Sequence, residues 1–180
     1  KAYAADMAAH GYLVLACDLI GGGPAATTPD EARALMGKVP ADERTAIVGA
    51  WVDWLKAHPQ GSGKVATVGF CFGGGWSLNA SLARPVDATV IYYGNVAKTA
   101  DDTKALAGPV LGHFASRDPN INKPMVDGFA AAMQAAGKSF EAHWYEADHG
   151  FANPTAARYD AEDTMLAQER TLAFLKTHLG

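Results

Sequence analysis

The chain has 180 residues, of which 49% are hydrophobic and 19% charged, and its formal net charge is −4 at pH 7. This composition excludes a disordered chain and fits a largely buried sheet, because an average soluble domain carries about 25% charged residues. The length predicts a single domain over residues 1–180. The acidic balance argues against nucleic-acid or anionic-membrane partners, which need clustered Lys and Arg. Apolar runs stay far below the ~18 residues of a membrane span.

The first eleven residues predict a helix that ends at Gly11 and has no N-cap. They contain neither an initiator Met nor the apolar stretch of a signal peptide. We therefore expect these residues to begin partway through a domain. Two cysteines are too few for a disulfide scaffold, which favours a cytoplasmic location.

After Gly11, short apolar runs alternate with segments of helical periodicity. Buried strands are predicted at 12–17, 64–70, 88–93, 109–115 and 140–145. Helices are predicted from about residue 30, from a cap at Asp42 to 58–59, and over 72–82, 124–136 and 160–179. The alternation predicts an α/β fold with a mostly parallel sheet and helices on both faces. Ligands bind beyond the carboxyl ends of such strands, so residues that follow strands are candidates for a site.

The segment Gly69-Phe70-Cys71-Phe72-Gly73 lies between a predicted strand and a predicted helix. It has the spacing of a nucleophile elbow, G-x-S-x-G, with Cys in place of Ser. A helix N-terminus at this point would favour the thiolate form of Cys71. The structural alternative is a Gly-rich turn around a buried Cys, and the spacing does not fit a dinucleotide-binding loop.

Two later residues complete a nucleophile–acid–histidine order. Asp118 follows the strand predicted at 109–115, and His149 follows the strand at 140–145. A thiol nucleophile needs a base, and the base needs a carboxylate that orients it. Either residue alone would be an ordinary loop residue, but three agreeing positions predict a Cys71–His149–Asp118 triad. Cys17 is expected in the core, and no spacing of ligands predicts a metal site.

The motifs together resemble the dienelactone hydrolase family of α/β-hydrolases. The segments that carry the resemblance are 69–74, 92–94, 113–114 with Asp118, 149–151 and 169–175. The resemblance covers essentially the whole chain. It implies an α/β-hydrolase fold without its first strands, a Cys–His–Asp triad, no cofactor, and opening of enol-lactones or related esters.

The sequence departs from the family pattern in two ways. The leading strands, which carry a Glu that contacts the resting Cys and a loop with one oxyanion-hole N–H, have no counterpart here. Gly22 and Asn153 stand where the family has the two Arg residues that hold the substrate carboxylate. The second departure argues against an anionic lactone, but it does not affect acyl chemistry at Cys71.

These residues predict a carboxylic ester hydrolase that works through a thioester at Cys71, on a small-molecule ester or lactone. The backbone N–H of Phe72 would supply half of the oxyanion hole. Candidate substrate-contacting residues flank the proposed triad in sequence: Trp144, Tyr145, Phe151 and Asn153. Trp144 and Tyr145 have a competing interpretation, in which they end a strand and pack under the last helix.

Two other functions stay open at this point. One is a broad carboxylesterase or thioesterase without lactone preference. The other is a non-catalytic binding protein that keeps the elbow without a productive oxyanion hole. The oligomeric state and the natural substrate are not determined by the sequence.

Overall fold

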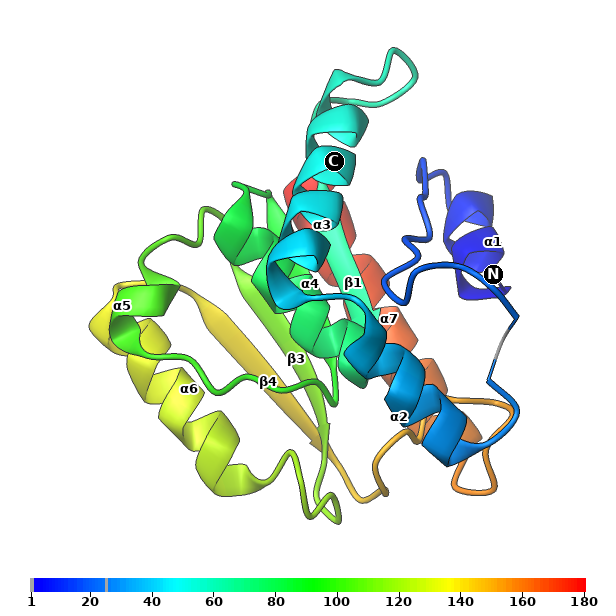
Figure 1. The fold of residues 1–180 in the computed structure, drawn as a ribbon. Helices are drawn as coiled ribbons and strands as arrows, with labels where there is room; N and C mark the ends of the chain where they lie inside the picture. The colour runs from blue at the N-terminus through cyan, green and yellow to red at the C-terminus, as the bar shows by residue number, and fades with distance from the viewer. Residues whose placement is uncertain (1, 25) are drawn as a thin grey trace. The chain divides into compact units, whose positions relative to one another are not determined.

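The computed structural model of the protein describes residues 2–24 and 26–180. It contains two compact units, Lys1–Gly63 and Lys64–Gly180 (Figure 1). That residues 1–180 form a single domain stays a prediction.

The first unit is helical in its described residues. Its elements are α1 (Ala2–Ala9), α2 (Pro29–Lys38) and α3 (Ala41–Ala57). As predicted, the chain leaves α1 at Gly11, whose φ of 90° suits glycine. A capping box between Thr28 and Glu31 fixes the start of α2.

The strand predicted at 12–17 is wrong. The segment is not part of any sheet, and Leu13 and Val14 are 41% and 37% exposed. A strand needs a partner for its backbone hydrogen bonds, and residues 2–24 and 26–63 contain no other strand. For the same reason Cys17 is exposed and not in a core as expected.

The cap predicted for α3 is also wrong. The helix begins at Ala41 after Pro40, which makes no side-chain cap hydrogen bond. Asp42 lies within the first turn, where its carboxylate favours the helix N-terminus through charge.

The second unit is built on a four-stranded parallel sheet with the order β1-β2-β3-β4. Its strands are β1 (Ala66–Phe70), β2 (Ala88–Tyr92), β3 (Val110–Ala115) and β4 (Phe140–Tyr145). Its helices are α4 (Phe72–Ala83), α5 (Ala100–Thr103), α6 (Lys123–Ala135) and α7 (Ala161–Leu179). The α/β architecture predicted from the alternation is therefore confirmed.

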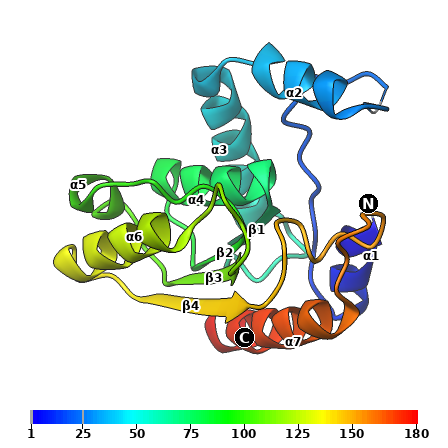
Figure 2. The same ribbon diagram turned by 90° about the horizontal axis from the view of Figure 1, so that it is seen from below.

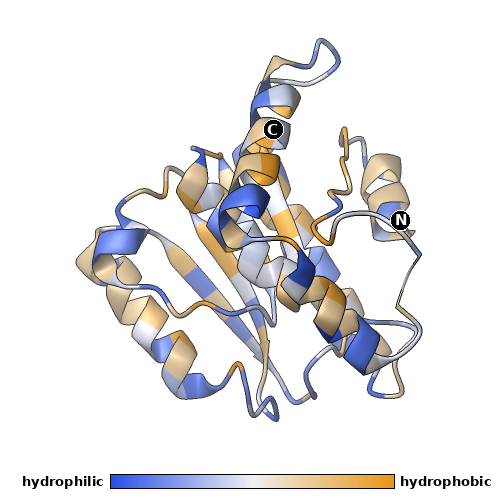
Figure 3. Ribbon diagram, in the orientation of Figure 1, coloured by the Kyte–Doolittle hydropathy of each residue, from blue (hydrophilic) through white to orange (hydrophobic). Residues whose placement is uncertain are grey.

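Helices cover both faces of this sheet. Figure 2 shows α4, α5 and α6 on one face and α7 on the other. Because β2 and β3 are covered on both sides, all their residues are buried, which explains their continuous apolar sequences. Figure 3 shows hydrophobic residues along the strands and a hydrophilic α5. The main core cluster draws on the strands, α4, α6 and the loops between them, and is formed by Leu78, Ile91, Val96, Leu106, Val110, Phe114, Ile121, Val126, Phe129 and Met133.

Candidate active site

Cys71 lies on a sharp turn between β1 and α4. Its φ of 53° and ψ of −119° are sparsely populated for a residue with a side chain. The turn is closed by hydrogen bonds from Cys71 N–H to the Tyr92 carbonyl (3.0 Å) and from Gly74 N–H to the Cys71 carbonyl (3.0 Å). The backbone thus projects the thiol at the carboxyl end of the sheet.

The glycines around Cys71 are required by the packing of backbone on backbone. A Cβ at Gly69 would overlap the Gly73 carbonyl. A Cβ at Gly74 would lie 2.8 Å from the Tyr92 carbonyl oxygen and 2.9 Å from the Gly94 Cα. Real Cβ atoms do not approach backbone this closely, so α4 can pack at this distance only with glycine at these positions.

Three predicted residues meet at this turn. The Cys71 Sγ is 3.0 Å from the His149 Nε2, and the His149 Nδ1 is 2.5 Å from the Asp118 Oδ2. A carboxylate can only accept, so Nδ1–H donates to Asp118 and Nε2 faces the sulfur. The three residues come from the loops after β1, β3 and β4.

Asp118 is held rigidly beneath the imidazole. The residue is 4% exposed, and its second oxygen, Oδ1, accepts backbone hydrogen bonds from Asn120 (2.9 Å) and Ile121 (3.1 Å). These bonds leave Oδ2 directed at His149. The carboxylate therefore fixes both the position and the tautomer of the ring.

The thiol and the imidazole shift each other's protonation in opposite directions. The hydrogen bond from His149 lowers the pKa of Cys71, and a hydrogen bond from the Phe72 N–H adds to this against the effect of burial. The hydrogen bond to Cys71 raises the pKa of His149 to about 8, with a further contribution from Asp118. Both shifts favour a thiolate–imidazolium pair. The Phe72 N–H is thus directed at the reactive sulfur.

The four residues expected near substrate lie in different surroundings. Trp144 packs against the Phe114 ring (5.5 Å between centroids) on the α6 side of the sheet. Tyr145 and Phe151 are buried, and their rings pack on each other at 4.9 Å. Asn153 is exposed, and its Oδ1 accepts hydrogen bonds from the Thr155 N–H and hydroxyl. Contact of these side chains with a substrate stays a prediction.

A network of side-chain hydrogen bonds holds the Tyr145 hydroxyl in place. Arg170 donates to the Tyr145 hydroxyl (3.0 Å), which leaves that O–H to donate to the His113 Nδ1 (2.8 Å). The His113 Nε2–H then donates to Thr171 (3.0 Å), which also hydrogen-bonds Tyr92 (2.7 Å). Burial lowers the pKa of His113 to about 3, so this ring is neutral and structural.

Two residues near the thiol were not identified from the sequence. Tyr93 follows β2 with a φ of 38°, and its ring lies edge-on to His149 at 5.2 Å. Burial and the nearby Cys71 raise the pKa of Tyr93, and its hydroxyl accepts a hydrogen bond from the Ala152 N–H. Arg158 lies over Gly150. Tyr93 could have been found as a residue at the carboxyl end of a strand, whereas no sequence pattern marks Arg158.

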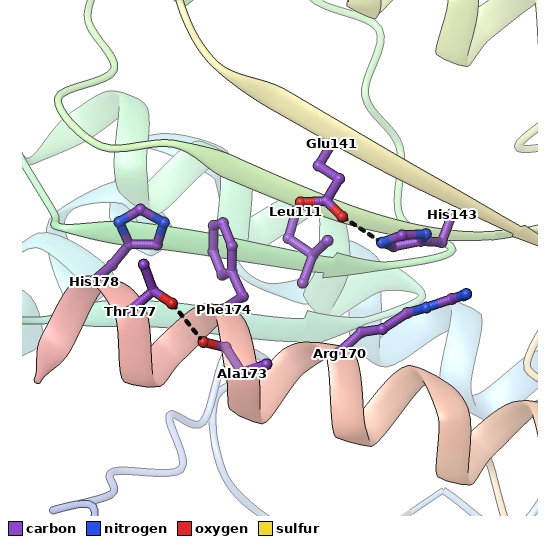
Figure 4. A pocket seen from close by; sticks show the side chains of 8 residues that line it. All are labelled: Leu111, Glu141, His143, Arg170, Ala173, Phe174, Thr177 and His178. Carbon is purple, nitrogen blue, oxygen red and sulfur yellow. Dashed lines mark hydrogen bonds and ion pairs between the residues drawn. The ribbon is translucent and has the colours of Figure 1, made fainter.

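A separate pocket of about 440 Å³ lies between α7 and strands β3 and β4 (Figure 4). It is lined by Leu111, Glu141, His143, Arg170, Ala173, Phe174, Thr177 and His178. Figure 4 shows the hydrogen bond between Glu141 and His143 (2.7 Å) at its rim. None of the residues at the Cys71 turn lines this pocket.

No group of three or more His, Cys, Asp or Glu residues in the described part of the chain could hold a metal ion. Across residues 2–24 and 26–180, none of the helices combines the length and apolar character needed to cross a bilayer.

Comparison with known proteins identifies similar chains. The model of the dienelactone hydrolase family matches residues 1–179. The carboxymethylenebutenolidase of Pseudomonas putida is 32% identical over 132 residues, which cover 70% of this chain and 54% of that protein. A candidate carboxymethylenebutenolidase of Saccharolobus solfataricus is 32% identical over 129 residues, covering 69% and 50%. The chain thus spans about half the length of these curated relatives.

The fold comparison agrees with the sequence comparison. The crystal structure of a candidate dienelactone hydrolase from Klebsiella pneumoniae superposes with a TM-score of 0.71 at 27% identity. The match covers 84% of this chain and 68% of that structure. The structure designated m3DLH has a TM-score of 0.86 at 23% identity, over 97% of this chain and 78% of that one. The expected α/β-hydrolase fold is therefore confirmed.

Proposed function

Because this chain belongs to the dienelactone hydrolase family, we propose that it hydrolyses carboxylic esters or lactones through nucleophilic attack by Cys71. The observation that carries the proposal is the hydrogen-bonded series Cys71–His149–Asp118, assembled from three separate loops. Such an arrangement of nucleophile, base and orienting carboxylate serves acyl transfer on many folds.

In the first step, the Cys71 thiolate forms a bond to the carbonyl carbon, and the carbonyl electrons move onto its oxygen. The Phe72 N–H, which hydrogen-bonds the sulfur, is close enough to stabilise that oxyanion. When the carbonyl re-forms, the bond to the alcohol oxygen breaks, and His149 gives that oxygen its Nε2 proton. The products of this step are an alcohol and a thioester on Cys71.

In the second step, water attacks the thioester carbonyl while His149 takes a proton from it. The carbon–sulfur bond then breaks, the acid leaves, and the thiolate–imidazolium pair is restored. One ester and one water thus give one acid and one alcohol. Asp118 remains a carboxylate throughout, because its role is to hold the Nδ1–H of His149.

An aryl ester is the substrate that tests this proposal. The tetrahedral intermediate can expel either the Cys71 thiolate or the alcohol oxygen. Because a thiolate leaves easily, the thioester forms efficiently only when the alcohol is also a good leaving group, as a phenol is. We expect the protein to hydrolyse 4-nitrophenyl butyrate and Cys71→Ala to lose that activity, while Cys17→Ala keeps it. Hydrolysis that persists unchanged in Cys71→Ala would exclude the assigned nucleophile. A folded protein that leaves both aryl esters and lactones intact would favour the non-catalytic binding function.

The breadth of the activity can be measured separately. A broad carboxylesterase or thioesterase would show similar kcat/KM values for an open-chain aryl ester and an enol-lactone of similar size. A preference for the lactone would support the activity named in the curated relatives. Cys71→Ala and Cys17→Ala serve as the controls with both the aryl ester and the enol-lactone.

A further inference from the structure

The outer strand of the sheet, β4, has an open edge. It pairs with β3 on one side, and no strand among residues 2–24 and 26–180 pairs with its other side (Figure 2). All residues of β3 are buried, whereas Glu141 and Ala142 in β4 are exposed. An open edge offers its backbone N–H and C=O groups to a further strand.

The hydrogen bonds between β3 and β4 show which backbone groups face outward. The carbonyls of Ser139 and Tyr145 accept hydrogen bonds of 3.0 and 2.8 Å from N–H groups at the start of β3 and directly after its end. Successive residues of a strand direct their backbone groups to alternate sides. The odd-numbered residues from 139 to 145 therefore face β3. The backbone groups of Phe140, Ala142 and Trp144 point away from the sheet.

The side chains of β4 divide between the two faces of the sheet. Phe140 and Trp144 pack on the α6 side, where the Phe140 ring lies 4.9 Å from the ring of Phe129. Glu141 and His143 lie on the α7 side, where they line the pocket and form a hydrogen bond of 2.7 Å (Figure 4). The strand thus carries aromatic rings on one face and an acid beside an imidazole on the other.

The features that usually keep an edge strand from pairing are missing in β4. Its sequence, Phe-Glu-Ala-His-Trp-Tyr, contains neither Lys nor Pro. Its register with β3 runs from Phe140 to Tyr145 without a skipped residue, so no bulge twists the edge away. The edge can therefore accept another strand along its whole length.

We propose that β4 is a self-association surface, on which two copies of the chain pair their β4 strands antiparallel about Ala142. In this register Ala142 exchanges both backbone hydrogen bonds with Ala142 of the second copy, and Phe140 does so with Trp144 of the second copy. Glu141 then lies opposite His143 of the second copy, in the closer type of pair with Cα atoms about 4.5 Å apart. The surface is independent of the proposed function, because β4 carries none of the three triad residues.

The charges of β4 select this register over its neighbours. A two-fold axis at Glu141 would set that carboxylate against its own copy, and an axis at His143 would set imidazole against imidazole. Like charges directly opposite each other destabilise a pair of strands. Intermediate registers fail because they set an outward-facing backbone group against one that is bonded to β3. The axis at Ala142 gives each acid an imidazole, and its small side chain does not crowd the centre.

The association is expected to be weak and reversible. A strand of six residues buries less surface than the about 1,600 Å² of a standard interface. We therefore expect a dissociation constant of about 1–100 μM. Sedimentation velocity across that range should show a monomer converting to a dimer. A protein that stays monomeric throughout would overturn the inference.

Ala142→Pro tests the backbone pairing. The N–H that proline removes points away from β3, and sheet edges tolerate proline in that orientation. We expect this variant to raise the dissociation constant at least about tenfold, because it loses bonds at the centre of the pairing. Ala142→Ser keeps the N–H and is the matched control. Equal dissociation constants for the two variants would contradict the pairing, and circular dichroism verifies that both are folded.

Charge exchange tests the register. Glu141→Lys sets an ammonium group against His143, and His143→Glu sets two carboxylates against each other. We expect each variant to associate about three- to thirtyfold more weakly than the parent. An equal mixture should recover the dimer, because the new lysine then faces the new glutamate and the remaining Glu141 faces the remaining His143. A mixture that dimerises no better than either variant alone would overturn the axis at Ala142.

The control for the charge change is Asp101→Lys. Asp101 is an exposed acid in α5, a helix that packs on α6 and not on β4. We expect its dissociation constant to equal that of the parent. A change as large as that of Glu141→Lys would show that net charge, and not the β4 pair, governs association.

Amide hydrogen exchange locates the pairing along the strand. In concentrated samples the N–H groups of Phe140, Ala142 and Trp144 should exchange about tenfold more slowly than in dilute samples, because the second copy bonds them. The N–H groups of Glu141 and His143 face β3 in both states, so their exchange should change little. A dimer that leaves the Ala142 N–H unprotected would associate through another surface and would refute the proposal.

Discussion

The His149 Nδ1 lies 2.5 Å from the Asp118 Oδ2, although the two residues are 31 positions apart in the sequence. The carboxylate has one oxygen for the imidazole and the other for two backbone N–H groups. This division makes Asp118 a rigid acceptor.

Asp118→Asn should therefore disable the site without removing its shape. The amide introduced at position 118 would present an N–H to the Nδ1 of His149, so the single ring proton of the neutral imidazole moves to Nε2. In that tautomer Nε2 cannot accept a proton from Cys71 or water. We expect kcat for 4-nitrophenyl butyrate to fall roughly 10²–10⁴-fold. Asp127→Asn, which only loses an exposed pair with Lys123, is the control. Equal activity of the two variants would contradict the orienting role of Asp118.

Iodoacetamide should modify Cys71 and not Cys17 during a short exposure near neutral pH. Both cysteine residues are exposed and both sulfurs are partly buried, so access does not separate them. Burial of its sulfur raises the pKa of Cys17, while the hydrogen bond from His149 lowers that of Cys71. We expect Cys71 to be alkylated about ten times faster than Cys17, or more. Mass spectrometry of peptides from quenched samples measures the two rates. Similar rates at both residues would argue against a stabilised thiolate.

The pH dependence of kcat/KM should have an acid limb below the ordinary thiol pKa. The lowered pKa of Cys71 keeps the thiolate present at lower pH, and the pair titrates as a unit. With a poor leaving group, such as an alkyl ester, activity should also decline above about pH 8 as His149 loses the proton it donates. With a 4-nitrophenyl ester this alkaline decline should be weaker. Flat profiles for both substrates would count against the pair.

Two glycines in helices of the second unit should respond oppositely to alanine. In Gly74→Ala the new Cβ meets the backbone of Tyr92 and Gly94, which cannot move aside. We expect a loss of at least about 1–3 kcal/mol in the free energy of unfolding. In Gly128→Ala nothing lies within 4 Å of the new Cβ, so the protein should gain about 0.5–1 kcal/mol. Urea unfolding measures both, and equal effects would refute the close-approach argument.

His113 should make the free energy of unfolding fall in acid. Its pKa is about 3 in the folded protein and about 6.5 when unfolded, so only the unfolded state gains a proton between these values. The stabilisation is therefore complete above about pH 6.5 and is lost as the pH falls toward 3. In His113→Gln this slope should be reduced over the same range. Unchanged slopes in urea unfolding at several pH values would show that His113 does not contribute.

The fold of the second unit was predictable because each of its strands finds a neighbour within the same stretch of chain. The residues from 64 onward therefore fold as their periodicity indicates, within one or two residues at each end. The segment 12–17 has a strand's composition but no strand to pair with among residues 2–24 and 26–63. Periodicity reports which face of a segment is apolar, and it does not report whether a partner exists.

The candidate site was predictable where function follows topology. Cys71, Asp118 and His149 each follow the end of a strand within four residues, and parallel strands bring their carboxyl ends to one edge. Arg158 could not be found in this way, because it reaches the site from the middle of a loop. Its guanidinium occupies space that a side chain at position 150 would fill, and Gly150 leaves that space open. This relationship is seen only in the structure.

The backbone at Cys71 has an energetic consequence for the whole molecule. A side chain at a φ of 53° costs about 1–3 kcal/mol, and glycine would adopt this conformation without that cost. Cys71→Gly should therefore unfold at a higher urea concentration than the parent protein while losing all hydrolysis. A sequence selected for stability alone would have glycine at position 71. The Cys71 side chain therefore lowers the free energy of unfolding, and its contribution to the protein is the thiol.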